Sequence, residues 1–290
     1  MNSIPTTLSP VDLKRFYRDG YVVVKRAFSP DDARAMQDEW WAELADLHGI
    51  RRDDRATWRQ PRGDLKRAKR SPIQTRFETP FVRGVLDDLL GPGTWSSPRH
   101  WGRVLTTFPQ GGAWELPTKI WHSDSLYRWH RDGLNGAFVF SFVDSVAPRS
   151  GGTLIVAGSQ HLLRRYDAAL TGAVRRSGRL EPFFDLHPWF AALAGRAPSP
   201  RDRVASFMDT DTDIDGVRVR VVELTGEPGD IVFAHPSIIH SPNPNCGDRP
   251  RFMRIAGLMT HRGLRMRRGD RDVRGDRDMR NEGSPEMRRR

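Results

Sequence analysis

The sequence predicts a mainly β protein whose helices pack around the outside of a β core. From about residue 95 onward, short β-branched and aromatic stretches alternate with turns that contain Gly or Pro, which is typical of an antiparallel sandwich or barrel. Before residue 95, the chain carries two Ser-Pro helix starts followed by apolar residues at helical spacing. We expect one folded domain over residues 1–262. Residues 263–290 contain few apolar side chains and are expected to form a basic, disordered tail.

The N-terminal third is predicted to be mostly helical. Ser9 and Pro10 form a helix cap and a first helical residue, and Gly20 ends that helix. Ser29 and Pro30 repeat the pattern, and Met36, Trp40, Leu44 and Leu47 follow on one helix face. The expected elements are a helix from 9 to 20, a strand at 21–24, a helix at 29–47, a polar loop at 48–76 and a helix at 81–90.

The rest of the chain is predicted to supply the strands of the core. Residues 210–216 look superficially like a calcium loop, but the Glu in twelfth place and the flanking helices are missing, so we expect a solvated loop. Residues 162–200 are predicted to be mostly helix and loop. The expected strands are 101–108, 137–143, 153–156, 217–224, 231–235 and 252–261.

Composition bounds the compartment of the protein. The single cysteine, Cys246, excludes an internal disulfide and fits a reducing cytosol. The sequence has no apolar run of about 18 residues, and residues 1–8 do not have the pattern of a secretory signal. We therefore expect a cytoplasmic protein without a membrane segment.

The net charge of +11 raises the question of a nucleic-acid partner. The excess lies largely in two segments, residues 51–76 and residues 262–290, and neither contains a recognisable nucleic-acid-binding module. We expect solvated basic segments, with a small molecule as the partner. The oligomeric state is not predicted by the sequence.

The strongest chemical signal is Trp121-His122-Ser123-Asp124. In an extended segment, a His and an Asp two positions apart point to the same face. They are two of the three ligands that a non-haem Fe(II) oxygenase needs. His130-Arg131-Asp132 has the same form and competes with this motif.

The third ligand is sought further along the chain. His235, His240 and His261 are the candidates, and Arg251 follows His240 by eleven positions. An Arg on the adjoining strand could bind a carboxylate near the metal through two hydrogen bonds, with Arg249 and Arg254 as the alternatives.

Three further segments resemble the phytanoyl-CoA dioxygenase-like family of Fe(II)/2-oxoglutarate oxygenases. They are the opening with Asp19-Gly20-Tyr21-Val22-Val23-Val24, the Gly-Gly turn and strand of residues 150–161, and the Gly-Asp strand of residues 228–235 followed by Ile239-His240-Ser241. The resemblance spans about residues 8–260, nearly all of the chain before the tail.

The resemblance implies a double-stranded β-helix (jelly roll, cupin-like) and three iron ligands, His122, Asp124 and His240. It also implies that Arg251 binds the C5 carboxylate of 2-oxoglutarate, which is used together with O2. The family spacing from the metal His to the Gly-Gly turn favours His122 over His130, and strand parity separates Arg251 from Arg254.

The implied reaction is the hydroxylation of a small-molecule metabolite with release of succinate and CO2. Desaturation, epimerisation or oxidative cyclisation in natural-product biosynthesis would use the same ligands. The alternative from another class is a non-catalytic jelly-roll protein that binds an anionic partner.

The sequence departs from the family pattern at two places. Pro242 stands where a serine often follows the distal His, so other residues must supply part of the polar co-substrate cradle: Ser241, Lys119, Ser123 or Thr153. The segment 162–215 is longer than usual and is expected to be a substrate lid insertion. We also expect His130, Trp129 and Arg131 to face the substrate, and His161, His235 and His261 to be structural.

Overall fold

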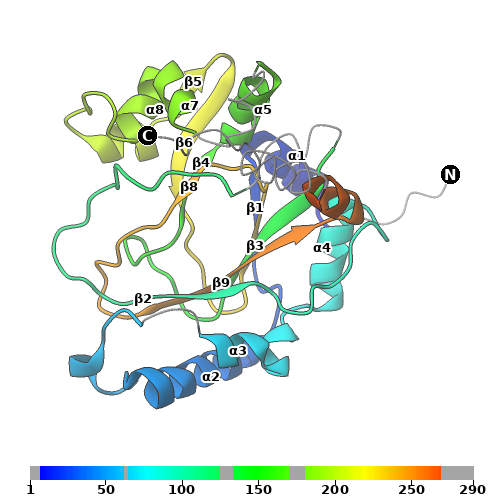
Figure 1. The fold of residues 1–290 in the computed structure, drawn as a ribbon, viewed down its shortest axis with the longest axis vertical. Coiled ribbons are helices and arrows are strands. Elements are labelled where there is room, and N and C mark those ends of the chain that lie inside the picture. Colours follow the sequence, from blue (N-terminus) through cyan, green and yellow to red (C-terminus); the bar gives the residue numbers. More distant parts are fainter. Residues whose placement is uncertain (1–6, 62–64, 125–132, 170–179, 269–290) are drawn as a thin grey trace, which may run out of the picture.

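The computed structural model describes residues 7–61, 65–124, 133–169 and 180–268. Two antiparallel sheets face each other, one with the strand order β1-β7-β3-β9-β2 and one with the order β5-β6-β4-β8 (Figure 1). This is the predicted jelly roll with peripheral helices. Its strands are β1 (Tyr21–Val24), β2 (Arg103–Thr107), β3 (Gly136–Phe142), β4 (Leu154–Ala157), β5 (Thr212–Ile214), β6 (Val217–Glu223), β7 (Ile231–Ala234), β8 (His240–Ser241) and β9 (Arg251–Met259).

The N-terminal helices cover the outer face of the five-stranded sheet. α1 (Pro10–Asp19), α2 (Pro30–His48) and α4 (Pro80–Leu90) form where the sequence predicted helices. The hydroxyls of Ser9, Ser29 and Thr79 each accept a backbone N–H at the helix start, and Gly20 ends α1 with φ +82°. Their apolar faces bury Trp40, Leu44 and Val85 against the sheet.

The prediction that residues 48–76 form one loop is wrong in part. This segment contains η1 (Arg55–Thr57), α3 (Lys66–Arg70) and η2 (Pro72–Thr75). α3 begins without a cap from its own sequence. Instead the buried Glu43 carboxylate on α2 accepts the backbone N–H groups of Arg67 and Ala68 at 3.1 and 2.6 Å. Because this cap comes from α2, the sequence next to α3 contains no cap residue that would predict where the helix begins.

A second helical layer covers the outer face of the four-stranded sheet. It consists of α5 (Ser159–Ala169), α7 (Glu181–Leu186), α8 (Pro188–Leu193) and the π-helix η4 (Ala205–Asp209). Phe183, Phe190 and Phe207 are buried beneath it with the outward side chains of β4 and β6. The described part of the predicted lid insertion is therefore a packed layer.

Two further segments differ from the prediction, one a predicted loop and the other the start of the predicted tail. Residues 210–216 form β5 and the turn of a β5–β6 hairpin, in which Asp215 and Gly216 both have positive φ. Residues 261–268 are helical, so the chain stays folded beyond the predicted boundary at 262, while residues 269–290 lie outside the described part. No described helix is both long and apolar enough to span a bilayer.

Candidate metal centre

Three side chains that lie far apart in the sequence converge at one end of the space between the sheets. His122 Nε2 lies 3.5 Å from Asp124 Oδ1, and His240 Nε2 lies 3.7 Å from Asp124 Oδ2. The two imidazole rings are 4.2 Å apart, and one ligand atom from each of the three residues lies within 4.8 Å of the others. Within the described ranges this is the group whose spacing suits a metal ion.

The backbone explains the convergence. His122 and His240 form an isolated antiparallel bridge, with N–H···O distances of 2.9 and 2.8 Å in the two directions. Directly opposed residues place their side chains on the same face, and Asp124 joins them because it is two residues further along. The predicted His-x-Asp alternation is therefore completed by a strand pairing that brings in His240.

Each histidine is oriented by a carbonyl two residues before it. His122 Nδ1 lies 2.8 Å from the Ile120 oxygen, and His240 Nδ1 lies 3.0 Å from the Ile238 oxygen. A carbonyl can only accept, so Nδ1–H donates to it in both rings, which turns Nε2 of each ring toward Asp124. Histidines that bind metals are commonly held in this way.

Charges at the site favour an ionised Asp124. The hydrogen bond from His240 lowers the pKa of Asp124 below its ordinary value, and the charges of His240, His122 and Arg103 act in the same direction, while burial opposes them. His240 is 4% exposed and packs edge-on against Phe138 at 5.7 Å. Once Nε2 has lost its proton in both rings, two imidazole nitrogens and one carboxylate, gathered from one side, fit a facial Fe(II) site with its other positions open.

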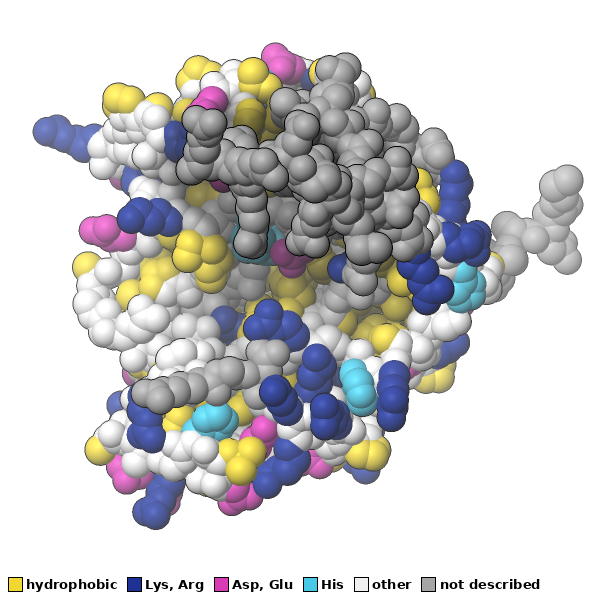
Figure 2. All heavy atoms as spheres, in the orientation of Figure 1, with side chains coloured by type: hydrophobic (Ala, Val, Ile, Leu, Met, Phe, Trp, Pro, Cys, Tyr) yellow, Lys and Arg dark blue, Asp and Glu magenta, His cyan; other side chains and the backbone are white. Residues whose placement is uncertain are grey.

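The open side of the cluster faces a hollow. Figure 2 shows this face of the molecule hollowed between the sheets, with a histidine and an acidic side chain visible inside. Beside His122 lies an open pocket of about 430 Å³ between the 118–123 segment and the α7–α8 layer. Its lining combines apolar side chains (Ile120, Trp121, Leu180, Phe184 and Ala194) with polar and charged ones (Thr118, His122, Ser123, Glu181 and Arg196).

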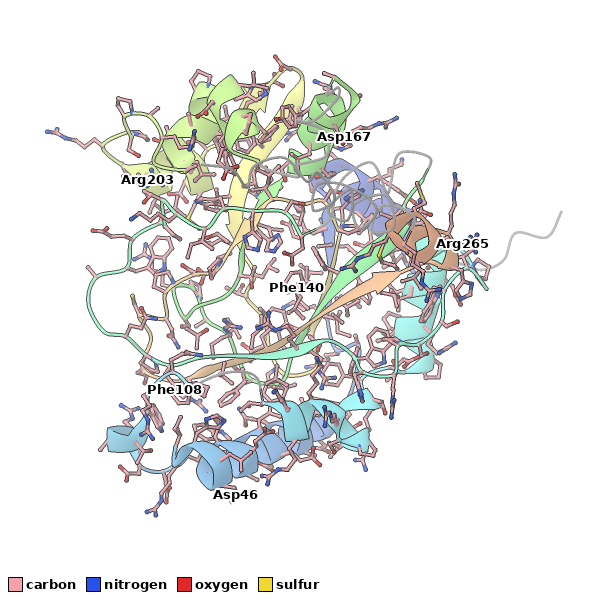
Figure 3. The ribbon with its side chains drawn as sticks, in the orientation of Figure 1. Asp46, Phe108, Phe140, Asp167, Arg203 and Arg265 are labelled. Carbon is pink, nitrogen blue, oxygen red and sulfur yellow. The ribbon has the colours of Figure 1, made fainter. Side chains whose placement is uncertain are left out.

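Arg251 also faces the space between the sheets. It is opposite Thr107 on β2 and two residues from Met253, which is buried in the inter-sheet core beside Phe140 (Figure 3). Its guanidinium donates to Thr107 Oγ1 at 2.5 Å and to the Leu105 carbonyl at 3.4 Å. Burial alone lowers the Arg251 pKa to about 10.

The two alternative arginines lie elsewhere. Arg254 has the opposite strand parity, donates to the Gln74 carbonyl and side-chain oxygen, and stacks over Phe77 at 5.3 Å in the outer helical layer. Arg249 is exposed in the turn before β9.

The residues proposed for a polar cradle do not share one face. Thr153 is buried and alternates with Ile155, which pairs with His240, so it faces inward. Ser241 faces the opposite way from His240, and its hydroxyl lies 3.3 Å from the Lys119 carbonyl. The Lys119 side chain is exposed, and Ser123 lines the pocket beside His122.

The three histidines that were expected to be structural, His161, His235 and His261, have contacts of that kind. His161 Nε2 lies 2.9 Å from the Tyr17 carbonyl, His261 Nε2 lies 2.9 Å from Ser96 Oγ, and His235 Nδ1 accepts the Ser237 N–H at 3.1 Å. Trp129, His130 and Arg131, expected to face the substrate, lie outside the described residues.

Sequence reasoning missed several supporting residues. Thr107 holds the Arg251 guanidinium, and the buried Asn245 amide donates to the Thr107 and Arg249 carbonyls at 2.8 Å each. The available signal was the Pro- and Asn-rich turn before β9. Ile120 was also missed, and its φ of +65° is rare for a β-branched residue.

Comparisons with known proteins identify the architecture. The family model described as phytanoyl-CoA dioxygenase (PhyH) matches residues 16–253. An L-proline trans-4-hydroxylase from Streptomyces griseoviridis is 26% identical over 250 residues, which cover 82% of this chain and 81% of the relative.

Two solved structures share the fold. The non-haem alpha-ketoglutarate-dependent carbocyclase SnoK from nogalamycin biosynthesis has a TM-score of 0.54 at 16% identity, covering 89% of this chain and 87% of its own. EctD from S. alaskensis with bound Fe has a TM-score of 0.53 at 18% identity, covering 89% and 79%. Because the family model spans most of the sequence, the chain belongs to the phytanoyl-CoA dioxygenase family and is an Fe(II)- and 2-oxoglutarate-dependent dioxygenase that consumes O2.

Proposed function

We propose that this enzyme hydroxylates a small molecule at an iron held by His122, Asp124 and His240, with 2-oxoglutarate anchored by Arg251. The observation that carries the proposal is the three-residue cluster, whose ligand atoms lie within 4.8 Å of one another and face an open hollow. When bound, Fe(II), 2-oxoglutarate and O2 supply the oxidation of a substrate C–H bond, with release of succinate and CO2.

The protein's own part in the metal site is orientation and charge. The carbonyls of Ile120 and Ile238 hold the two imidazoles with Nε2 toward the metal position. Asp124 contributes a negative charge, since its pKa is lowered chiefly by the hydrogen bond from His240. Together they occupy one side and leave the other for co-substrate and O2.

Arg251 fits the far carboxylate of 2-oxoglutarate. No described carboxylate lies within ion-pair distance of its guanidinium, and its buried Nε–H has no acceptor among the described residues. A buried cation without an anion is unfavourable, and a ligand carboxylate would compensate it through charge-assisted hydrogen bonds. Thr107 and Leu105 hold the guanidinium on the inner face.

A small substrate with both apolar and charged parts is supported by the pocket beside His122, which Glu181 and Arg196 also line. Its volume of about 430 Å³ is in the range of small-molecule sites. Hydroxylation is supported by the curated relative, whose name describes a hydroxylase of L-proline. Ile120, Phe184 and Leu180 would contact the apolar part of such a substrate.

The direct test uses purified protein without oxygen. Fe(II) plus 2-oxoglutarate should give the weak visible charge-transfer band of a chelate, and His122→Ala and Asp124→Ala should each abolish it. The matched control is His161→Ala, which removes a histidine whose ring contacts the Tyr17 and Arg18 carbonyls of α1 and should leave the band intact. A wild-type band in both ligand variants would refute the assignment. A panel of amino acids and other small metabolites, scored by succinate release, then identifies the substrate.

A further inference from the structure

Arg203 ties the helical layer to the segment that carries His122. Its guanidinium donates to the Ala192 carbonyl at 3.0 Å and to the Leu193 carbonyl at 2.9 Å, at the end of α8. The same group reaches the Pro117 carbonyl at 3.3 Å and also binds the Ser199 hydroxyl. Figure 3 shows Arg203 beside this layer. One side chain therefore joins two segments that the sequence separates by more than seventy residues.

The environment of Arg203 is unusual for a cation. It stacks over Phe207 at 5.0 Å, and burial lowers its pKa. In the part of the chain that the structure describes, no carboxylate is within ion-pair distance, and the buried Nε–H has no acceptor. Neutral carbonyls thus provide most of its hydrogen bonds. A planar fork can hold several carbonyls in a fixed geometry, which an ammonium cannot.

The Pro117 carbonyl, which accepts a hydrogen bond from Arg203, lies at the start of a strained turn. Pro117 also accepts the Trp121 indole N–H at 3.0 Å, which closes the turn from 117 to 121. Ile120 sits inside this turn with φ +65°, a conformation that a β-branched residue keeps only when its surroundings impose it. The Ile120 carbonyl is the group that orients the His122 ring. The residue with the strained backbone, Ile120, is therefore also the residue whose carbonyl orients the metal ligand His122.

A second contact fixes the same pair of segments. Gly195 follows α8 with φ +65°, and a Cβ added there would lie 2.9 Å from Thr118 Cβ. The backbone of the helical layer thus meets the 117–121 turn with no room for a side chain.

We propose that Arg203 is a positioning residue of the metal centre. Its guanidinium binds the Pro117 carbonyl and the carbonyls at the end of α8, and so fixes the 117–121 turn against the helical layer. This contact stabilises the left-handed backbone conformation of Ile120. The Ile120 carbonyl then holds the His122 ring with Nε2 toward Asp124. The segment 180–209 is then part of the support of the metal site, in addition to any role as a lid. The inference rests on the proposed ligand assignment.

The test measures the affinity of the unloaded protein for Co(II), whose d–d absorption reports ligand geometry. Arg203→Met should weaken Co(II) binding by about 10- to 100-fold, the usual effect of removing a group that orients a ligand. Arg203→Lys should also weaken it, because one ammonium cannot span the three carbonyls. Arg201→Met is the matched control: this exposed arginine lies two positions away, and its loss should change nothing.

A rescue variant separates positioning from general destabilisation. Ile120→Gly removes the strain at φ +65°, so Ile120→Gly/Arg203→Met should recover Co(II) affinity to within about threefold of wild type, whatever its melting temperature. Wild-type affinity in folded Arg203→Met and Arg203→Lys, or no recovery in the double variant, overturns the proposal. His122→Ala must lose Co(II) binding in the same assay. If it does not, the ligand assignment fails independently of Arg203.

Discussion

Arg251 and Arg254 offer a matched pair for testing how 2-oxoglutarate is anchored. They lie three residues apart on β9, both are buried, and burial lowers the pKa of each to about 10. Only Arg251 faces the space between the sheets. We therefore compare Arg251→Met with Arg254→Met, since methionine keeps an unbranched apolar stem and removes the charge.

The two variants should differ in their requirement for 2-oxoglutarate. Losing one partner of a buried charge pair costs about 2–5 kcal/mol, so Arg251→Met should raise the 2-oxoglutarate requirement at least roughly 30-fold. Arg254→Met should leave it within about twofold, because Arg254 contacts Gln74 and Phe77 in the outer layer. Metal content should be unchanged in both variants.

The two variants should also differ in the free energy of unfolding of the unliganded protein, and here Arg254→Met should be the more affected. The fall of the Arg251 pKa from 12.5 to about 10 corresponds to roughly 3 kcal/mol against the buried charge, while its two hydrogen bonds return about 1 kcal/mol each. Unliganded Arg251→Met should therefore be as stable as wild type or slightly more stable. Arg254→Met removes a similar burial cost, but it leaves the buried Gln74 carbonyl without a donor and removes the stacking on Phe77, while Gln74 Oε1 keeps the Trp40 indole N–H; it should therefore be less stable than Arg251→Met by about 1–3 kcal/mol.

The assays are 2-oxoglutarate titration of the anaerobic Fe(II) band and urea unfolding without ligand. The reasoning is refuted if Arg254→Met raises the 2-oxoglutarate requirement as much as Arg251→Met. It is also refuted if Arg251→Met strongly destabilises the unliganded protein, because that would make Arg251 a structural cation.

Three further outcomes are expected. Asp124 has a lowered pKa in the folded protein, so its contacts with the two histidines stabilise the metal-free fold at pH values above the ordinary Asp pKa. This stabilisation is lost as the pH falls through the lowered pKa. Asp124→Asn should therefore have a lower urea midpoint than wild type at pH 7, and the two midpoints should converge in acid. Gly195→Ala should lower the free energy of unfolding by about 1–2 kcal/mol through its positive φ and the clash with Thr118, measured by thermal or urea unfolding. Glu43→Ala should lose about 2 kcal/mol because it removes the cap of α3, and amide hydrogen exchange should rise first at residues 66–70.

Local sequence was sufficient for elements whose signals are contained in a few residues. The Ser caps and Gly20 determined where α1 and α2 begin and where α1 ends, because a cap needs only its own first turn. The His-x-Asp alternation placed two side chains on one face for a similar reason, since the period of an extended chain is two. Strand parity likewise separated Arg251 from Arg254, although it could not say which of the two faced inward.

Tertiary structure decided what no local window contains. The pairing of His122 with His240 joins segments more than one hundred residues apart, and it alone brings the third side chain to Asp124. The cap of α3 comes from Glu43, and the inward face of β9 was decided by the packing of Phe252 and Arg254 against the outer helices. In the same way, the turn at Ile120 keeps its left-handed conformation in contact with distant residues. The sequence thus determined which side chains are available and how they alternate, whereas long-range packing decided which of them meet.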